Sequence, residues 1–530
     1  MPIKSLISSV IAAALALPAV AQIDTRPVPA EPRASTLPAN WQHGVFMEVF
    51  VRGYQDSNGD GIGDLRGLTQ RLDYLKKLGI SGLWLMPITA SSDHDHGYAT
   101  TDYRGIEPQY GTLADFDELI REAHKRGIGI VMDYVINHAS WQFPPFQQAV
   151  ADRNSPWRSW FVWNTNPGPG WDIWGKVPWY DAATKPWTWT GEWKDMPAIT
   201  PGSPDIFFGT FGPHMPDFNM RNPAVVQYHE DSLRFWLNRG LDGYRLDAVP
   251  HFIENNAKDW NDQPESRALT KRFQDLIKNY PSRYVVCEAT AEPIAYGEPE
   301  LCGGAFAFNQ NYEIIKAAKG DAAAVQKMAD YYRAMSPTMA TFLHNHDIFT
   351  GQRVWDQLHG DDARYRLAAA SYLLLPGTPF VYYGEEIGQA GIDGKGDDPL
   401  RAPMSWTPAG GFTTNPQPFR PLSLNRSRNN AETQAREAGS LFNFYRELIA
   451  LRRASPALTL GRYEADKVEG QVWRFERVHG KERVLVAINY GDTPAAIELP
   501  ARARALYPKA ATPRAALPPL SLRVYRLEAP

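Results

Sequence analysis

Three acidic residues stand at the ends of short apolar runs in the sequence. Asp247 and Glu288 each close such a run, and Asp347 follows another within a few residues. An acidic side chain in this position is costly to bury unless it has a partner or a chemical role. Two carboxylates at one site are the usual machinery for breaking a glycosidic bond, since one attacks the acetal carbon while the other protonates the leaving oxygen.

These acids are far apart along the chain, with 41 residues from Asp247 to Glu288 and 59 from Glu288 to Asp347. They meet only if separate strands deliver them to one rim of a sheet. Arg245 lies two residues before Asp247, so on a strand both side chains face the same side. We expect its guanidinium to keep the Asp247 carboxylate ionised. For each acid taken alone, a salt-bridged position on the rim is the alternative.

The elements that would position these residues alternate in type. Short apolar runs alternate with segments of helical period, as in 68–78, 116–125, 225–238 and 442–453. This order predicts parallel strands joined by helices, and eight strand candidates predict an α/β fold of the (β/α)8 TIM barrel type. The expected strands are 45–50, 82–87, 128–134, 243–247, 284–288, 306–309, 339–344 and 379–383.

Two parts of the chain break this alternation. Residues 139–215 are rich in Trp, Pro, Gly and Asn, and so long a stretch after the third strand predicts an inserted domain, domain B. It divides the catalytic barrel into 41–138 and 216–457. Beyond the barrel, three strand candidates occur with no helix between them, so we expect residues 458–530 to form a small antiparallel β domain. Those candidates are 472–475, 484–489 and 522–527.

The N-terminus has the pattern of an export signal. Lys4 precedes a run of apolar or small residues over 6–20, and Ala19-Val20-Ala21 offers a cleavage site. We expect residues 1–21 to be a signal peptide and the protein to be secreted or periplasmic. A membrane anchor is the alternative, but spanning takes about 18 or more apolar residues. The proline-rich residues 22–40 are predicted to be an extended tether.

Composition excludes several classes of protein. The 530 residues are 43% hydrophobic and 22% charged, which is typical of a globular protein rather than a disordered one. The net charge of -4 gives no positive electrostatic field that would attract a polyanion, so we expect no nucleic-acid partner. We also expect a monomer. Cys287 and Cys302 are the two cysteines. Export permits a disulfide between them, but Cys287 in a buried strand can equally pack as a small hydrophobic residue.

A second kind of signal follows the first expected strand. Oxygen-bearing side chains recur at alternate positions between Asp56 and Asp64, with glycines where the loop must turn. The spacing resembles the first nine positions of an EF-hand calcium loop, although position twelve is Gly67 instead of Glu. We expect a structural Ca²⁺ here, and a hydrogen-bonded turn is the alternative. The candidate ligands are Asp56, Asn58, Asp60, Ile62 and Asp64.

Five segments, in order, resemble the signature regions of glycoside hydrolase family 13, the α-amylase family. They read DYVINH at 133–138, MPDFN at 215–219, GYRLDAVPH at 243–251, VCE at 286–288 and HNHD at 344–347. The resemblance runs from about Trp41 to the end of the chain. It implies a retaining enzyme acting on α-linked glucans. Relatives in the family carry a loop like Asp56–Asp64 after their first strand and bind calcium there.

The resemblance also implies roles for single residues. Asp247 would be the nucleophile that forms a β-glycosyl-enzyme, Glu288 the general acid and then base, and Asp347 the group that holds the sugar hydroxyls. Tyr98, past the second strand, would be a stacking platform for the sugar. The residues expected to bind substrate are Asp95, Tyr98, His138, Arg245, His251 and His346.

The expected reaction is cleavage of α-1,4 bonds in starch-derived glucans and maltooligosaccharides. An exo-acting α-glucosidase, or a transglycosylase that converts maltose, is the alternative. Pro250 stands where many endo-acting relatives have a basic residue, and Asp95 lies three residues before Tyr98 as in exo-acting ones. Against this, Met215 stands where typical glucosidases have Gln, which resembles relatives of mixed amylase and oligosaccharide specificity, and the Trp-rich insert offers stacking sites for a longer chain. A non-catalytic glucan-binding or transporter-associated homologue is a remote alternative, because such proteins usually lack one of the three acids.

Overall fold

The computed structural model describes residues 22–165, 171–182, 205–499, 502–509 and 516–528. The expected signal peptide, 1–21, lies outside the described residues, as do residues 183–204 of the Trp-rich insert. Within the described ranges, no helix has the length and apolar character needed to cross a membrane.

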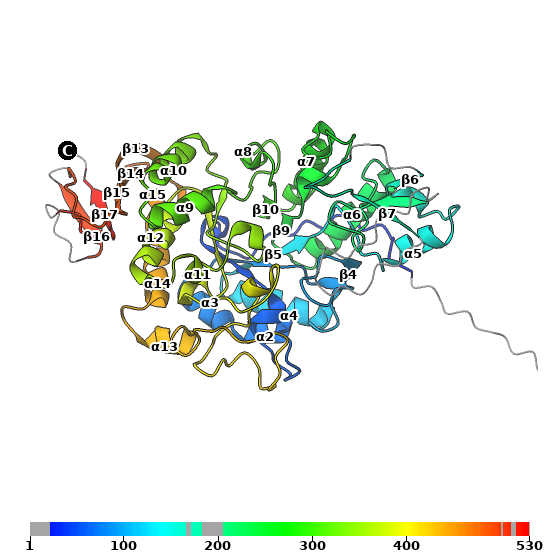
Figure 1. Cartoon of the computed structure of the whole chain (residues 1–530), viewed down its shortest axis with the longest axis horizontal. Helices are drawn as coiled ribbons and strands as arrows, with labels where there is room; N and C mark the ends of the chain where they lie inside the picture. Colours follow the sequence, from blue (N-terminus) through cyan, green and yellow to red (C-terminus); the bar gives the residue numbers. More distant parts are fainter. Residues whose placement is uncertain (1–21, 166–170, 183–204, 500–501, 510–515, 529–530) are drawn as a thin grey trace, which may run out of the picture.

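A parallel sheet forms the centre of the molecule (Figure 1). Every neighbouring pair in it is parallel, as the alternation of runs and helices predicts. Its seven strands occur in the order β10-β9-β5-β2-β1-β12-β11. Their bounds are β1 (Phe46–Val49), β2 (Gly82–Leu85), β5 (Gly129–Tyr134), β9 (Gly243–Leu246), β10 (Tyr284–Cys287), β11 (Ala340–Thr341) and β12 (Thr378–Tyr382).

The eighth position of the barrel is reduced to two bridges. Ala305 pairs with Cys287, and Phe306 pairs with Ala340, so this segment joins β10 to β11 and brings the ring close to closure. The prediction of a full strand over 306–309 is therefore wrong. Asn309 adopts a φ of 70°, and helix α9 starts at the next residue, which leaves no length for a longer ladder. The TIM barrel itself is confirmed.

Strand period divides the barrel residues between two cores. On β1, Phe46 points into the barrel, and its ring centroid lies 4.9 Å from that of Tyr284 and 5.1 Å from that of Phe380. Met47 and Val49 belong to the outer core between strands and helices. The interior is thus a packed aromatic cluster at this level, so a ligand can reach the barrel only at its rim.

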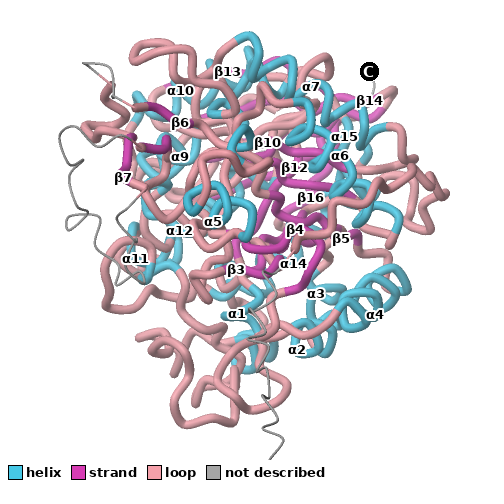
Figure 2. The backbone as a smooth tube through the Cα atoms, turned by 90° about the vertical axis from the view of Figure 1, so that its right-hand side faces the viewer, coloured by secondary structure: helices cyan, strands magenta, loops and turns pink. Residues whose placement is uncertain are grey.

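Helices surround the strands, as Figure 2 shows. Their ends follow local chemistry: α4, for example, starts at a capping box of Thr112 and Asp115. The helices are α1 (Val51–Tyr54), α2 (Leu65–Gln70), α3 (Leu72–Leu78), α4 (Leu113–Lys125), α5 (Pro144–Ala151), α6 (Pro223–Asn238), α7 (Pro264–Lys278), α8 (Pro293–Gly297), α9 (Gln310–Ala318), α10 (Ala322–Ala334), α11 (Val354–Gln357), α12 (Asp362–Leu373), α13 (Ala431–Arg436), α14 (Leu441–Ala454) and α15 (Pro456–Leu460).

The insert between β5 and α6 contains a small antiparallel sheet of order β6-β8-β7, at the right of Figure 1. Two bridges, His138 to Asp217 and Phe161 to Phe218, fasten the insert to the segment that returns to the barrel. The small sheets outside the barrel are β6 (Trp163–Asn164), β7 (Trp179–Asp181) and β8 (Ile206–Phe208) in the insert, and β3 (Thr89–Ser91) with β4 (Thr100–Ile106) after β2.

The predicted C-terminal β domain is confirmed. Five strands form a wholly antiparallel sheet of order β13-β14-β15-β17-β16 at the left of Figure 1. They are β13 (Arg462–Glu469), β14 (Val472–His479), β15 (Glu482–Asn489), β16 (Ala503–Tyr507) and β17 (Ser521–Leu527).

Residues 22–40 have no helix or strand. They run along α6, where the Val28 amide donates to Asp231 at 3.0 Å and Asn238 donates to the Pro29 carbonyl at 2.9 Å. The segment that we expect to be an extended tether is thus bound to the surface of α6.

Candidate active site

The three predicted acids meet at the rim where the barrel strands end. Asp247 and Glu288 directly follow β9 and β10, and Asp347 follows β11 after six residues. Arg245 contacts the Asp247 carboxylate, and its Nη2 lies 3.1 Å from Oε2 of Glu288. Asp347 lies 3.3 Å from Nε2 of His346. Parallel strands therefore bring acids 100 residues apart into one site, as expected.

Arg245 is the centre of this group. Its side chain is 1% exposed, and its Nη1 also lies 2.9 Å from Asp133 at the end of β5. The Asp133 carboxylate further accepts from the Tyr98 hydroxyl at 2.9 Å and from the Trp84 indole at 3.1 Å. Asp133 was absent from the predicted site residues. It follows an apolar run just as Asp247 does, so the same criterion would have identified it.

Acids outnumber cations in this part of the site. Burial raises the pKa of Asp247 well above its ordinary value, and Glu288 adds to that shift while Arg245 opposes it. Burial also raises the pKa of Asp133 to about 6. One guanidinium serves three carboxyls here, and Arg245 acts to lower the pKa of Asp247 against burial and Glu288. The expectation that Arg245 keeps Asp247 ionised stays a prediction.

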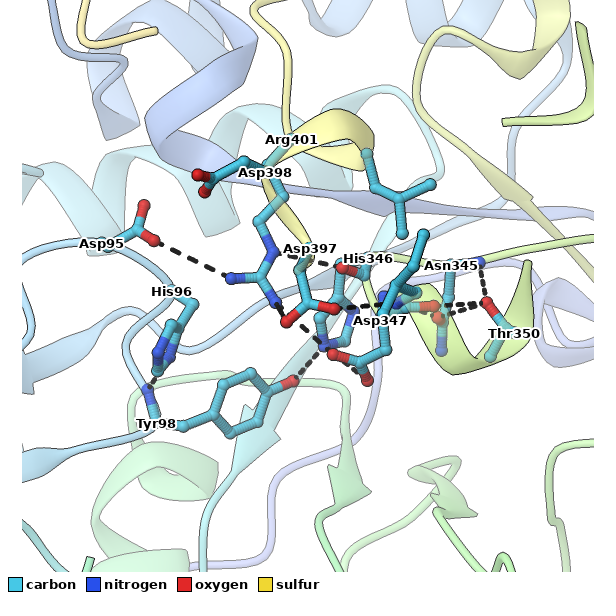
Figure 3. A network of polar contacts seen from close by, with 12 residues as sticks. Asp95, His96, Tyr98, Asn345, His346, Asp347, Thr350, Asp397, Asp398 and Arg401 are labelled. Atoms are coloured by element: carbon cyan, nitrogen blue, oxygen red, sulfur yellow. Dashed lines mark hydrogen bonds and ion pairs between the residues drawn. The ribbon is translucent and has the colours of Figure 1, made fainter. Parts of the chain in front are cut away.

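Tyr98 and His346 form a stacked pair beside the acids (Figure 3). The Tyr98 hydroxyl lies 2.8 Å from Nε2 of His346, and Nδ1 of that ring lies 2.6 Å from Oε1 of Glu48 on β1. Burial lowers the pKa of His346 well below its ordinary value, so the ring is neutral at neutral pH. Glu48 and Tyr98 thereby fix its orientation.

His138 and His251 are buried neutral histidines. Burial lowers the pKa of His138 to about 3 and that of His251 to about 4. Both rings lie beside Phe211, with centroids 5.1 and 5.5 Å away. Neither ring nitrogen of His138 has a hydrogen-bond partner among the described residues. Buried donors without partners are costly, and a bound sugar hydroxyl would satisfy them.

Asp95 lies in the rim loop that also carries Tyr98. Its carboxylate is 2.8 Å from both terminal nitrogens of Arg420 and 3.8 Å from Nη1 of Arg401. Arg401 donates to the His346 carbonyl at 3.1 Å, and its Nη2 lies 3.4 Å from Asp347 (Figure 3). Asp95 is thus joined through Arg401 to the catalytic candidates.

Contacts therefore link Asp95, Tyr98, Arg245 and His346 to the three acids, and His138 and His251 flank them at Phe211. Arg401 and Arg420 are not among the site residues that the sequence predicts. They lie in loops after β12, where no apolar run or period marks a position, and only their tertiary contacts reveal them. Burial raises the pKa of Asp347 to about 8, with Asp397 adding to the shift and Arg401 opposing it.

The predicted calcium loop is a tight hydrogen-bonded turn. Asp56 accepts from the amides of Asn58, Gly59 and Gly61 at 2.7 to 2.9 Å. Gly59 and Gly61 have φ values of 82° and 94°, a backbone conformation that residues with a Cβ atom rarely adopt. Asp64 accepts from the Gly67 amide and caps α2.

The loop fits calcium in part. Burial acts to raise the pKa of Asp56, but hydrogen bonds from Thr413 and three amides outweigh it, so a negative charge is kept. All the candidate donors are oxygens, which suit a hard cation. However, no three acidic, histidine or cysteine side chains among the described residues gather closely enough to hold a metal. Calcium at Asp56, Asn58, Asp60, Ile62 and Asp64 stays a prediction.

The two cysteines are paired. Cys287, the last residue of β10, forms a disulfide with Cys302. This resolves the alternatives for these residues and ties the strand that carries Glu288 to the loop before Ala305.

Residues 48–461 match the family model "Alpha amylase, catalytic domain". The chain is 34% identical over 484 residues to the trehalose synthase/amylase TreS of Mycolicibacterium smegmatis, covering 81% of this chain and 79% of that one. It is 32% identical to alpha-amylase 3 of Dictyoglomus thermophilum, covering 85% of each. Among solved structures, the alpha-glucosyl transfer enzyme XgtA has a TM-score of 0.79 at 27% identity, over 92% of this chain and 99% of that one.

Proposed function

This chain belongs to the α-amylase family, and from that premise we propose that it acts on the terminal glucosyl unit of short α-linked glucosides such as maltose. Members of the family are glycoside hydrolases or glucosyl transferases, so the chain is an enzyme acting on α-glucosidic bonds. The observation that carries the finer proposal is the chain of contacts Asp95–Arg401–Asp347. These charged side chains lie beside Asp347, and we propose that they close the site to a longer glucan there.

We propose a double displacement with retention. Asp247 attacks the anomeric carbon while Glu288 gives its proton to the leaving oxygen, which breaks the glycosidic bond and leaves a glucosyl ester. Glu288 then takes a proton from water or a sugar hydroxyl, whose oxygen displaces Asp247. Both carboxylates contact one guanidinium, and this closeness supports the retaining geometry over the inverting one.

Transfer within the site is a second candidate. His251 follows Asp247 by four residues in the loop after β9, and we take its side of the site as the leaving-group side. Its ring stacks on Trp260 with centroids 5.5 Å apart, and Trp174, 59% exposed, lies 5.4 Å away. Aromatic faces of this kind could retain a released glucose for re-attack. Similarity to the trehalose synthase/amylase TreS also favours such an isomerisation.

A timed product profile tests these proposals. The enzyme is incubated with maltose, maltotriose and starch, and products are separated by chromatography. We expect glucose and short transfer products, and trehalose from maltose would establish the second candidate. Early release of long maltooligosaccharides from starch, with no activity on maltotriose, would instead indicate an endo-acting α-amylase. No product from any substrate would favour a non-catalytic homologue.

We also propose that the protein is exported. The pattern over 1–21 and the disulfide between Cys287 and Cys302 support an oxidising compartment. Sequencing the N-terminus of protein recovered outside the cytoplasm tests this, and the expected first residue is near Gln22. An N-terminus at Met1 in that fraction would contradict cleavage.

A further inference from the structure

The joint of the barrel with the least strand pairing lies beside β10. The sheet of seven strands begins at β10 and ends at β11, and the segment between them contributes one bridge to each. The Cys287 amide donates to the Gly304 carbonyl at 2.9 Å, and the Cys287 carbonyl accepts from the Phe306 amide at 3.2 Å. By contrast, β9 pairs with all four residues of β10. Thus β10 is held along its whole length on one side and through Cys287 on the other.

Glu288, the proposed acid, directly follows this joint. Its amide donates to the Leu246 carbonyl at 2.9 Å, its Oε2 accepts from the Ala248 amide at 3.0 Å, and Nη2 of Arg245 lies 3.1 Å from that oxygen. All three partners belong to β9 or to the residues directly after it. On the other side, the backbone of Glu288 depends on the residue before it, Cys287. The position of the carboxyl therefore depends on how firmly β10 is held there.

A disulfide supports β10 at this point. Cys287 is bonded to Cys302, 15 residues further along the chain, and both side chains are 0% exposed. Val286 packs inside the barrel and Cys287 packs in the outer core, so alternation turns the next side chain, Glu288, away from the disulfide. The bond lies on the outer face of β10 and can act on Glu288 only through the backbone.

The disulfide also holds the segment that fills the gap in the sheet. Cys302 lies two residues before Gly304, and its amide donates to the carbonyl of Tyr296 in α8 at 3.2 Å. Gly304 approaches β10 so closely that a Cβ atom there would lie 2.6 Å from the carbonyl oxygen of Val285. A covalent bond two residues from this contact keeps the two segments together.

We propose that the Cys287–Cys302 disulfide positions Glu288 for its work as acid and base, so that full activity requires an environment in which the bond is oxidised. The inference rests on the proposed role of Glu288. Each cysteine is a positioning residue, because both are buried away from substrate. The bond forms when the two thiols give two protons and two electrons to the disulfide of an exchange partner, which is reduced to two thiols. A dithiol such as dithiothreitol reverses this step and is itself oxidised to a cyclic disulfide.

The test compares two substrates that share a glucosyl unit. Maltose has a sugar leaving group that needs a proton from the acid, whereas the fluoride of α-glucosyl fluoride leaves with little such help. The variants are Cys302→Ala and the double variant Cys287→Ala/Cys302→Ala. The matched control is Glu300→Ala, an exposed position two residues before Cys302 that leaves the bond intact. Glu288→Gln is the reference for a lost acid. Melting temperatures and free thiols are measured alongside kcat/KM.

We expect kcat/KM on maltose to fall about 10–100-fold in both cysteine variants, since a misplaced catalytic group costs up to ~10²-fold. On α-glucosyl fluoride kcat/KM should fall less than about threefold, because bond breaking there depends less on the acid. Glu288→Gln should show the same selective loss on a larger scale, and Glu300→Ala should match the wild type on both substrates. Wild type reduced with dithiothreitol until both cysteines titrate as thiols should behave as the variants do.

The outcomes separate the two proposals. Equal losses on the two substrates overturn the positioning role alone, since the bond would then support the fold and not the acid. Unchanged kcat/KM on maltose in both cysteine variants also overturns it. If neither variant folds, the reduced wild type decides by the same ratio, and a reduced chain that unfolds counts as an equal loss. A Glu288→Gln variant that cleaves maltose like the wild type, or a wild type inactive on both substrates, overturns the proposed function and this inference with it.

Discussion

Glu288 is placed to give a proton at the rim of β10. Its Oε2 accepts from the Ala248 amide at 3.0 Å and lies 3.1 Å from Arg245. Glu288→Gln keeps the size and these polar neighbours but has no acidic proton, so we expect kcat on maltose to fall about 10²–10⁴-fold. The melting temperature should stay close to that of the wild type. More than about a tenth of wild-type activity would exclude this residue as the acid.

Asp347 should make the stability of the free protein depend on pH. Its pKa rises from 3.8 to about 8 on folding, chiefly through burial. The folded state therefore binds this proton more tightly, and the stability gained is full below about pH 4 and is lost as the pH rises toward 8. The side chain is 22% exposed, so solvent reduces the effect.

We expect the melting temperature of the wild type to fall between pH 5 and 8, and to fall less in Asp347→Asn. Some slope should remain, because Asp247 and Asp133 shift in the same direction. Thermal melts at several pH values measure this, with Asp330→Asn, an exposed acid on α10, as control. If the melting temperatures of the wild type and Asp347→Asn changed with pH in the same way, the raised pKa of Asp347 would be refuted.

At the scale of elements, the loop from Asp56 to Asp64 follows β1 and is hydrogen-bonded to residues 412–420. If calcium binds this loop in the folded state alone, calcium at about 100 times its Kd adds ~2.7 kcal/mol to the free energy of unfolding. Chelation should then lower the melting temperature, and Asp60→Ala should abolish that response. Asp330→Ala should keep it. If protein reloaded with calcium had the same melting temperature with and without chelator, calcium binding would be contradicted. The loop would then be a hydrogen-bonded turn without a metal.

At the scale of the whole molecule, Arg477 connects the C-terminal sheet to the barrel. It lies on β14, is 1% exposed, and donates to the carbonyls of Leu374 and Gly461, each at 2.9 Å. Arg477→Ala leaves these buried acceptors unpaired, so we expect unfolding to become easier by ~1–3 kcal/mol. Arg474→Ala, on the same strand but more exposed, should change stability by less than ~0.5 kcal/mol.

Scanning calorimetry checks this connection. The wild type should melt in one transition, because α15 and the buried arginine link the two domains. Arg477→Ala should lower the transition or split it. An unchanged transition in that variant would mean that the C-terminal sheet contributes nothing to barrel stability.

The sequence by itself determined the order of the elements and the acids of the site. Strand and helix periods are local, and the barrel rule places every strand end on one rim, so Asp247, Glu288 and Asp347 followed from their positions after apolar runs. The signature segments added His138 and His346, and the family resemblance past the second strand added Tyr98. The C-terminal sheet followed from strands with no helix between them.

Tertiary structure decided what depends on contacts between distant loops. Arg420 reaches Asp95 across 325 residues, and no local pattern encodes that distance. Asp133 and Asp247 share one guanidinium only after the barrel closes, and their raised pKa values follow from the water that closure excludes. The expected strand over 306–309 is only two bridges, at Ala305 and Phe306, because α9 begins at Gln310. Periodicity determines which face of a strand or helix a side chain lies on. The residues that it contacts there are determined only when the barrel closes and brings distant loops together.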